Sequence, residues 1–332
     1  MALDLSIACW TRDLTRSLLT GAVEPDGVDP TVIAEYPPRR HRRFFERGEF
    51  DVCEVSLASY LSSRERPGEY PFTAIPVFPC KKFPQSFCYR RTDAGIEDPS
   101  DLAGERVGVQ SWQTTRDVWM RGIARERYGL DLSDVTWYRR KEDDVPVSIP
   151  DRFDIRTVPG EQGGEAMVDP DDLRAMFFDS DLVAAMEPAN AMFHSVVESD
   201  EAALMFDDPV ETEREYYRDT GIHPIMHTVA VRDELLDDHP WLAVSLFDAF
   251  REARDDALEA NLSPSTHTTN TWAHLHLVEQ DRVLGEDAWE YGLTDRTVPE
   301  LEKFQEYADR QGLIPEPYDL DELFVDCSVA RT

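Results

Sequence analysis

The chain has 332 residues, of which 41% are hydrophobic and 10% aromatic, enough for packed cores and too many for global disorder. Asp and Glu number 67 against 34 Lys and Arg, and the formal net charge of -33 argues against DNA or an anionic membrane as a partner. No stretch approaches the roughly 18 consecutive apolar residues of a membrane-spanning helix.

The acidic residues are spread along the chain instead of being collected in a tail, as in DDVPVSIPDRFD and REARDDALEA. Self-repulsion of this size becomes tolerable where molar salt shortens the Debye length to about 3 Å. We therefore interpret the acidity as adaptation of the surface to high salt, as in a protein from a halophile. A generically acidic protein with a cationic partner is the alternative.

The cysteines and the start of the chain bear on its location. The first strand-like run begins at Leu3, without the basic and long apolar stretches of a secretory signal. The five cysteines are odd in number and follow no metal-ligand spacing. Reduced thiols in a cytoplasmic protein fit both observations. The cysteines are Cys9, Cys53, Cys80, Cys88 and Cys327.

Strand and helix patterns alternate through the first third of the chain, which favours a parallel, doubly wound α/β sheet. A helix opened by two prolines is expected over 37–49, and a second helix over 57–65. The expected strands cover 3–9, 31–36, 50–56 and 72–78.

The middle of the chain repeats this alternation. An amphipathic helix is expected over 114–129, ending at Gly129. Residues 141–172 are rich in Pro, Gly and acidic residues and are expected to form loop and turns. The other expected elements are a capped turn or short helix over 98–105, strands over 106–111, 135–139, 181–187 and 202–206, and helices over 172–178 and 189–196.

The last third begins with a strand pattern over 225–231 and continues with long helices over 239–262 and 299–313. Between these helices, STHTTNTWAHLH carries three histidines whose spacing matches no standard metal motif, so we expect a polar loop there.

Eight phrases run in order and with ordinary spacing to about residue 293. They are ACWTRDLTRSLLTG, GEFDVCEVSLASYL, FTAIPVFPCKKFPQS, TDAGIEDPSDLAGERVGV, TTRDVWMRGIARERYG, EYYRDTGIHPIMHTVAVR, HPWLAVSLFDAF and WEYGL. Together they resemble the 4,5-dihydroxyphthalate decarboxylase family over almost the whole chain.

The resemblance implies an α/β, two-lobed, type II periplasmic-binding-protein-like fold, in which each lobe is a mostly parallel sheet flanked by helices and a cleft lies between the lobes. Residues 1–92 and 223–332 are expected to form the first lobe, and 93–222 a second lobe inserted into it. The chain would cross between them near FCYRRT and GIHPIMHT. Ligands of such sheets bind beyond the carboxyl ends of the strands.

The family reaction would remove one carboxylate from 4,5-dihydroxyphthalate to give protocatechuate. A hydroxyl para to the leaving carboxylate feeds electrons into the ring, so that a proton adds at the carboxyl-bearing carbon and carbon dioxide departs. The resemblance therefore implies a carboxy-lyase that acts on a small aromatic carboxylate without cofactor or metal; a homo-oligomer is compatible with it. A solute-binding or sensing protein that closes on an aromatic acid without chemistry is the alternative.

Two expected helix starts offer donors for the two carboxylates of such a substrate. Ser56 and Ser59 open one helix, and Gln113, Thr114 and Thr115 open another. Hydroxyls, backbone N–H groups and the helix dipole make a carboxylate cradle at such positions. Ordinary N-cap residues without a ligand are the alternative for both sets.

Two further binding residues are expected after the first strand. Trp10 would stack on the aromatic ring, and Arg12 would fork onto a carboxylate. A core tryptophan and a surface ion pair are the alternatives.

The acid–base residues are expected at GIHPIMHT and MEPAN. We predict His227 as the proton donor, with His223 binding or orienting a ring hydroxyl. Glu187 ends an expected strand and is predicted to hydrogen-bond the catechol. Structural histidines, and a carboxylate that merely precedes a helix at Pro188, are the alternatives.

Overall fold

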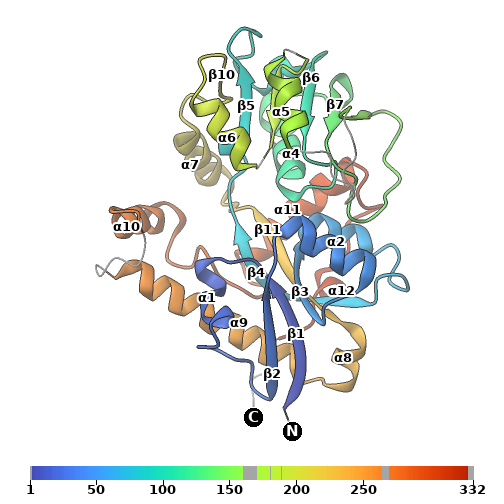
Figure 1. Ribbon diagram of the computed structural model, residues 1–332, viewed down its shortest axis with the longest axis vertical. Helices are drawn as coiled ribbons and strands as arrows, with labels where there is room; N and C mark the ends of the chain where they lie inside the picture. Colours follow the sequence, from blue (N-terminus) through green and yellow to red (C-terminus); the bar gives the residue numbers. More distant parts are fainter. Residues whose placement is uncertain (1, 160–169, 180, 188, 264–268, 328–332) are drawn as a thin grey trace. The chain divides into compact units, whose positions relative to one another are not determined.

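The structure is a computed structural model that describes residues 2–159, 170–179, 181–187, 189–263 and 269–327 (Figure 1). The chain divides into two compact units. Unit 1 comprises 1–82, 221–303 and 316–332, and unit 2 comprises 83–220 and 304–315.

This division differs from the predicted lobes at both crossings, since 83–92 group with unit 2 and 221–222 with unit 1, and in one further segment near the end of the chain. The prediction assigns all of 223–332 to the first lobe, whereas 304–315 group with unit 2. These residues include the second half of α11 (Thr297–Arg310), whose Phe304 and Tyr307 rings contact Trp119 with centroids 5.2 and 5.6 Å apart. Because α11 is one continuous helix, its periodicity carries no sign that its two halves pack in different units.

Unit 1 is built on a five-stranded sheet of order β2-β1-β3-β11-β4. β1 pairs in parallel with β2 and β3, and β11 pairs antiparallel with β3 and β4, so only β11 runs against the others. The strands are β1 (Leu3–Cys9), β2 (Val28–Ala34), β3 (Val52–Ser56), β4 (Phe72–Lys81) and β11 (Ile225–Arg232).

α2 (Pro37–Arg47) begins and ends where its sequence signals indicate. α2 starts on Pro37, whose missing N–H costs nothing at a first turn, and ends at Gly48 with a left-handed φ of 58°. α2 packs on β3, and α9 packs on α1 and β4. The helices in and around this unit are α1 (Asp13–Leu19), α2 (Pro37–Arg47), α3 (Leu57–Ser63), α8 (Asp233–Asp238), α9 (Leu242–Leu262), α10 (Ala273–Leu284) and α12 (Leu320–Leu323).

Unit 2 is built on a six-stranded sheet of order β10-β5-β9-β6-β7-β8. Only β5 runs against the other strands, because β10 and β9 both pair with it antiparallel and β9, β6, β7 and β8 are parallel. The strands are β5 (Cys88–Arg91), β6 (Arg106–Val109), β7 (Thr136–Arg139), β8 (Asp154–Thr157), β9 (Ala184–Met186) and β10 (Ala202–Leu204).

A buried cluster that includes Tyr89, Leu173 and Phe177 forms one core of unit 2. On α4, all ten residues from Thr115 to Ala124 are buried, and the helix ends at Gly129 with a φ of 71°. The helices are α4 (Thr115–Tyr128), α5 (Pro170–Phe178), α6 (Asn190–Val197) and α7 (Pro209–Thr220).

Two expected loops are wrong in part. The expected loop over 141–172 contains β8, an edge strand that is mostly exposed and therefore lacks the apolar alternation by which strands are recognised. Residues 160–169 of this expected loop lie outside the described part of the chain. The expected polar loop STHTTNTWAHLH runs into α10 at Ala273, although its residues 265–268 also lie outside the described part. In α10, the apolar residues Leu275 and Val278 are exposed, so they do not form the buried apolar face from which a helix is predicted.

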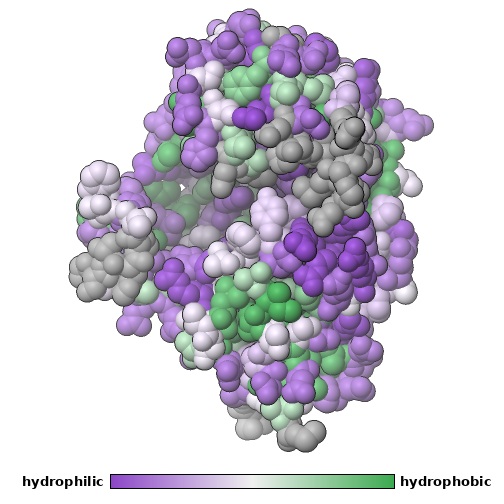
Figure 2. All heavy atoms as spheres, viewed as in Figure 1, coloured by the Kyte–Doolittle hydropathy of each residue, from purple (hydrophilic) through white to green (hydrophobic). Residues whose placement is uncertain are grey.

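The surface is rich in hydrophilic residues (Figure 2), as the highly charged composition indicates. Hydrophilic residues cover most of the face drawn in Figure 2. Among the helices of the described residues, none combines the length and apolarity that a membrane crossing requires.

Candidate active site

The carboxyl edge of the unit 1 sheet collects polar side chains from three strands. The parallel strands β1 and β3 end there, and the reversed strand β11 begins there. Trp10 follows β1, Ser56 is the last residue of β3, and His227 lies opposite Ser56 in the register of β11. The β11–β4 pairing is irregular on both sides of His227, and such bulges re-aim side chains at functional edges.

Glu54 is the centre of this cluster and is fully buried. Its Oε1 lies 2.5 Å from Arg12 Nη1, 2.5 Å from His227 Nδ1 and 3.3 Å from Arg40 Nη2. Its Oε2 accepts the backbone N–H of Trp10 at 2.8 Å. Glu54 is not among the residues predicted from the sequence, although a charged residue inside the apolar strand VCEVS signals a buried carboxylate that must be paired.

Arg40, on α2, is a second site residue that was not predicted from the sequence. Its fully buried guanidinium donates to the carbonyl oxygens of Glu54 and Glu35 at 2.7 and 3.1 Å. Arg12 remains 19% exposed while it pairs with Glu54. Two guanidiniums around one carboxylate leave a net positive charge here, in a chain whose formal net charge is -33.

The protonation of the cluster follows from burial and charge. Burial raises the pKa of Glu54, but Arg12, Arg40 and the hydrogen bond from His227 outweigh it and hold that pKa well below its usual range. Burial lowers the pKa of His227 to about 3, and the hydrogen bond to Glu54 opposes that shift only in part. Glu54 is therefore ionised and His227 neutral at pH 7, so Nδ1 carries the imidazole proton and Nε2 carries a lone pair.

Aromatic rings flank the cluster. The rings of Trp10 and Tyr36 meet edge to face with centroids 5.5 Å apart, and Tyr36 is 50% exposed. The rings of His41 and His227 are 5.3 Å apart, also edge to face. Trp10 thus lies beside the buried ions, partly exposed, where an aromatic ring could stack on it.

Ser56 and Ser59 lie at the start of α3 and are both buried. The Ser56 hydroxyl accepts the backbone N–H of Ser59 at 3.4 Å, the contact of an N-cap. The structure thus brings Trp10, Arg12, Ser56 and His227 of the predicted set to one edge of the sheet, with Ser59 one turn into α3.

His223 is placed away from the contacts of Glu54. Its backbone N–H donates to Glu300 at 3.1 Å, its Nδ1 lies 3.2 Å from the carbonyl oxygen of Ala288, and its ring meets Trp289 edge to face. Glu300 also pairs with Lys81 at 2.7 Å, with both side chains fully buried. Burial lowers the pKa of His223 to about 3, so its imidazole is a neutral packing partner at pH 7.

The predicted residues of unit 2 lie at the carboxyl edge of its own sheet. Both ends of the Gln113 amide are bonded to the backbone of Val145, at 3.0 and 3.1 Å. The Thr114 hydroxyl lies 2.9 Å from that of Ser111, and Thr115 is buried in the first turn of α4.

Glu187 follows β9 and pairs with the fully buried Arg140 through two contacts of 2.6 and 3.1 Å. It also accepts the backbone N–H of Ala189 at 3.0 Å. This fork uses both carboxylate oxygens, so the arrangement is that of a structural ion pair at the carboxyl edge of the sheet.

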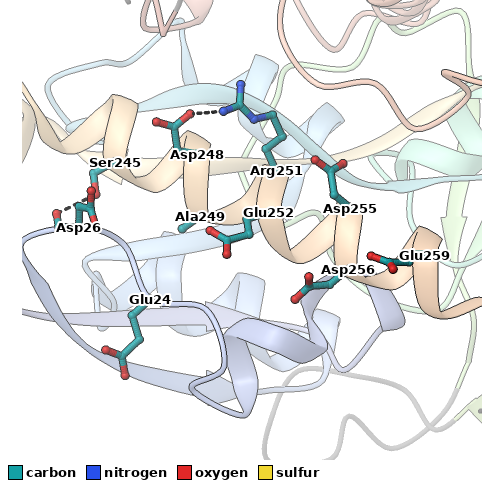
Figure 3. A pocket seen from close by; sticks show the side chains of 10 residues that line it. All are labelled: Glu24, Asp26, Ser245, Asp248, Ala249, Arg251, Glu252, Asp255, Asp256 and Glu259. Carbon is teal, nitrogen blue, oxygen red and sulfur yellow. Dashed lines mark hydrogen bonds and ion pairs between the residues drawn. The ribbon is translucent and has the colours of Figure 1, made fainter. Parts of the chain in front are cut away.

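A hollow of about 460 Å³ lies elsewhere on unit 1, between α9 and the loop before β2. Figure 3 shows that its labelled side chains are mostly carboxylates, with Arg251 paired to Asp248. A ring of negative charge repels an aromatic dicarboxylate, so this hollow does not suit such a substrate. Within the described chain, no three His, Cys, Asp or Glu residues are grouped closely enough to hold a metal ion.

The chain has relatives among proteins of known name. No protein-family model matches it. It is 34% identical over 301 residues to a 4,5-dihydroxyphthalate decarboxylase of Comamonas testosteroni, covering 88% of each chain. It is 43% identical over 137 residues to a 4,5-dihydroxyphthalate decarboxylase of Pseudomonas putida, covering 41% of this chain and 53% of the relative.

Solved structures show the fold. The aliphatic sulphonate binding protein SsuA of Escherichia coli aligns with a TM-score of 0.59 at 13% identity, covering 100% of this chain and 95% of SsuA. The desulfurization enzyme DszB, in a mutant complexed with biphenyl-2-sulfinic acid, aligns with a TM-score of 0.55 at 18% identity, covering 98% and 97%. The predicted α/β fold of the periplasmic-binding-protein-like type is confirmed.

Proposed function

The chain belongs to the 4,5-dihydroxyphthalate decarboxylase family of carboxy-lyases, and from this membership we propose that it converts 4,5-dihydroxyphthalate to protocatechuate and carbon dioxide.

The observation that carries the proposal is the Glu54 cluster. It combines a local excess of positive charge from Arg12 and Arg40 with a neutral imidazole, His227, beside the Trp10 ring. A dianionic aromatic ring needs this combination of positive charge, an aromatic contact and a proton acceptor.

His227 supplies the acid–base step in this proposal. Its neutral Nε2 accepts the proton of the hydroxyl para to the leaving carboxylate, and the oxygen's electrons enter the ring. The ring carbon then takes up one proton from solvent, its bond to the carboxylate breaks, and carbon dioxide departs as the ring regains aromaticity. The imidazolium returns its proton to the product's oxygen, so the reaction consumes one proton overall. The neutral imidazole thus accepts a proton before it donates one.

Carboxylate binding is assigned to Arg12, Ser56 and Ser59, with Thr114 and Thr115 as the corresponding donors of unit 2. The packing of His223 and the Arg140 fork on Glu187 favour supporting roles for those two residues. Ser59→Ala and Thr115→Ala should each weaken the affinity for 4,5-dihydroxyphthalate, measured by calorimetry. Unaltered affinity in both variants would rule out these cradles.

A cytoplasmic location in a salt-rich cell is proposed from the state of the cysteines and from the net charge. All five cysteines are free, four of them buried, as in proteins of a reducing cytoplasm. The net charge of -33 favours a cell interior with a high salt concentration.

The experiment is a carbon dioxide release assay on purified protein with 4,5-dihydroxyphthalate in molar KCl, with and without a chelator. Release of carbon dioxide with stoichiometric protocatechuate is expected, and an undiminished rate with chelator is expected of chemistry carried by the side chains alone. A folded protein that releases none would contradict the proposed substrate.

A further inference from the structure

The contacts of His227 show that one side of its ring is already committed. Nδ1 lies 2.5 Å from Glu54 Oε1, and Glu54 is an ionised carboxylate that can only accept. The proton of the neutral imidazole must therefore lie on Nδ1. The ring is also 14% exposed, so it is neither sealed in a core nor free in solvent.

Glu54 is itself held from several directions. Arg40 donates from Nε to the Glu54 carbonyl oxygen and brings Nη2 to within 3.3 Å of the carboxylate, so one buried guanidinium fixes both main chain and side chain. Arg12 binds Oε1, and the Trp10 N–H binds Oε2. A carboxylate with this many donors has little freedom to move away from His227.

The strand register brings the two side chains to the same face of the sheet. His227 is opposite Ser56, and Glu54 precedes Ser56 by two residues, so their side chains point the same way from adjacent antiparallel strands. A simple buried ion pair would be complete with Arg40 alone. The additional contact with His227, at an irregularity of β11, is what a structural pair does not require.

We propose that Glu54 is a positioning residue that accepts the Nδ1–H of His227 and so presents Nε2, as a bare lone pair, to the hydroxyl of the substrate. This inference deepens the proposed function and rests on it. When Nε2 takes up the hydroxyl proton, the Nδ1–H···Glu54 bond stays intact and becomes an ion pair, which stabilises the imidazolium.

The test measures the tautomer of His227 directly, without substrate, by ¹⁵N NMR of histidine-labelled protein. The His227 resonances are assigned by their loss in His227→Ala. In the wild type the proton is expected on Nδ1. Glu54→Asp keeps the charge but withdraws the carboxylate by one methylene, and it should move protonation toward Nε2. A wild-type proton on Nε2 would overturn the proposal.

A control variant separates positioning from folding. Glu54→Gln leaves the guanidiniums of Arg12 and Arg40 without their carboxylate and should be strongly destabilised, which is why Glu54→Asp is the principal variant. Glu300→Gln removes another fully buried, paired carboxylate of unit 1 and should leave the His227 tautomer unchanged. An equal change of tautomer in Glu300→Gln would show that general loosening, not Glu54, is responsible.

Kinetics complete the test. Glu54→Asp should lower kcat by about 100-fold or more, as expected for a misplaced acid–base group, with KM changed far less. A shifted tautomer with unchanged kcat would overturn the positioning role. If the wild type is inactive on 4,5-dihydroxyphthalate yet carries the proton on Nδ1 of His227, the failure lies with the proposed substrate and the Glu54–His227 geometry still holds.

Discussion

His227→Ala separates the catalytic step from binding. General acid–base catalysis contributes about 10²- to 10⁴-fold, equivalent to about 2.7–5.4 kcal/mol of transition-state stabilisation, and kcat should fall by that amount. In the ground state His227 offers a hydroxyl one neutral hydrogen bond worth about 0.5–1.5 kcal/mol, so affinity should weaken by about tenfold at most. Arg12, Ser56 and Ser59, to which carboxylate binding is assigned, are unchanged in this variant.

The variant should stay folded, because Glu54 keeps Arg12, Arg40 and the Trp10 N–H as partners. The assay pairs carbon dioxide release with calorimetric binding of 4,5-dihydroxyphthalate in molar KCl. His239→Ala, a half-buried histidine at the end of α8, is the matched control and should retain wild-type kcat. A His227→Ala enzyme whose kcat stays within about threefold of wild type would refute the assignment of the acid–base step.

Three further outcomes follow from buried charge and from salt. Lys81→Met should lower the unfolding free energy by about 3–5 kcal/mol, because it leaves the buried Glu300 carboxylate without its partner. The double variant Lys81→Met/Glu300→Gln should recover most of that loss, measured by urea titration. An equal loss in the single and double variants would contradict a buried pair. Because folding lowers the pKa of His223 and His227 to about 3, the unfolded state binds more protons between about pH 6.5 and 3, so unfolding free energy should fall as pH falls through that window. His223→Asn should reduce this slope, and an unchanged slope would count against a neutral His223. Lowering KCl from about 1 M to about 0.1 M lengthens the Debye length from about 3 to about 10 Å and should lower the thermal midpoint, whereas a midpoint independent of salt would argue against adaptation of the surface to salt.

Local patterns in the sequence were sufficient for most secondary structure. The prolines that open α2, the glycines after α2 and α4, and the strand pattern of β11 all act within a few residues of the element that they start or end. The edge strand β8 escaped because its exposed residues carry no alternation. The family phrases reached further, since they carry the order of the elements along the chain.

What the sequence determined by itself was the class of fold, the family and the candidate His227, because each is written in contiguous residues. The tertiary structure decided which of those residues meet. Glu54 and His227 are 173 residues apart and touch only because β3 and β11 pair antiparallel in one register. The same register leaves His223, four residues earlier and before the strand begins, against Ala288 and Glu300. A pairing partner so distant in the chain is set by topology and burial, which no local pattern records.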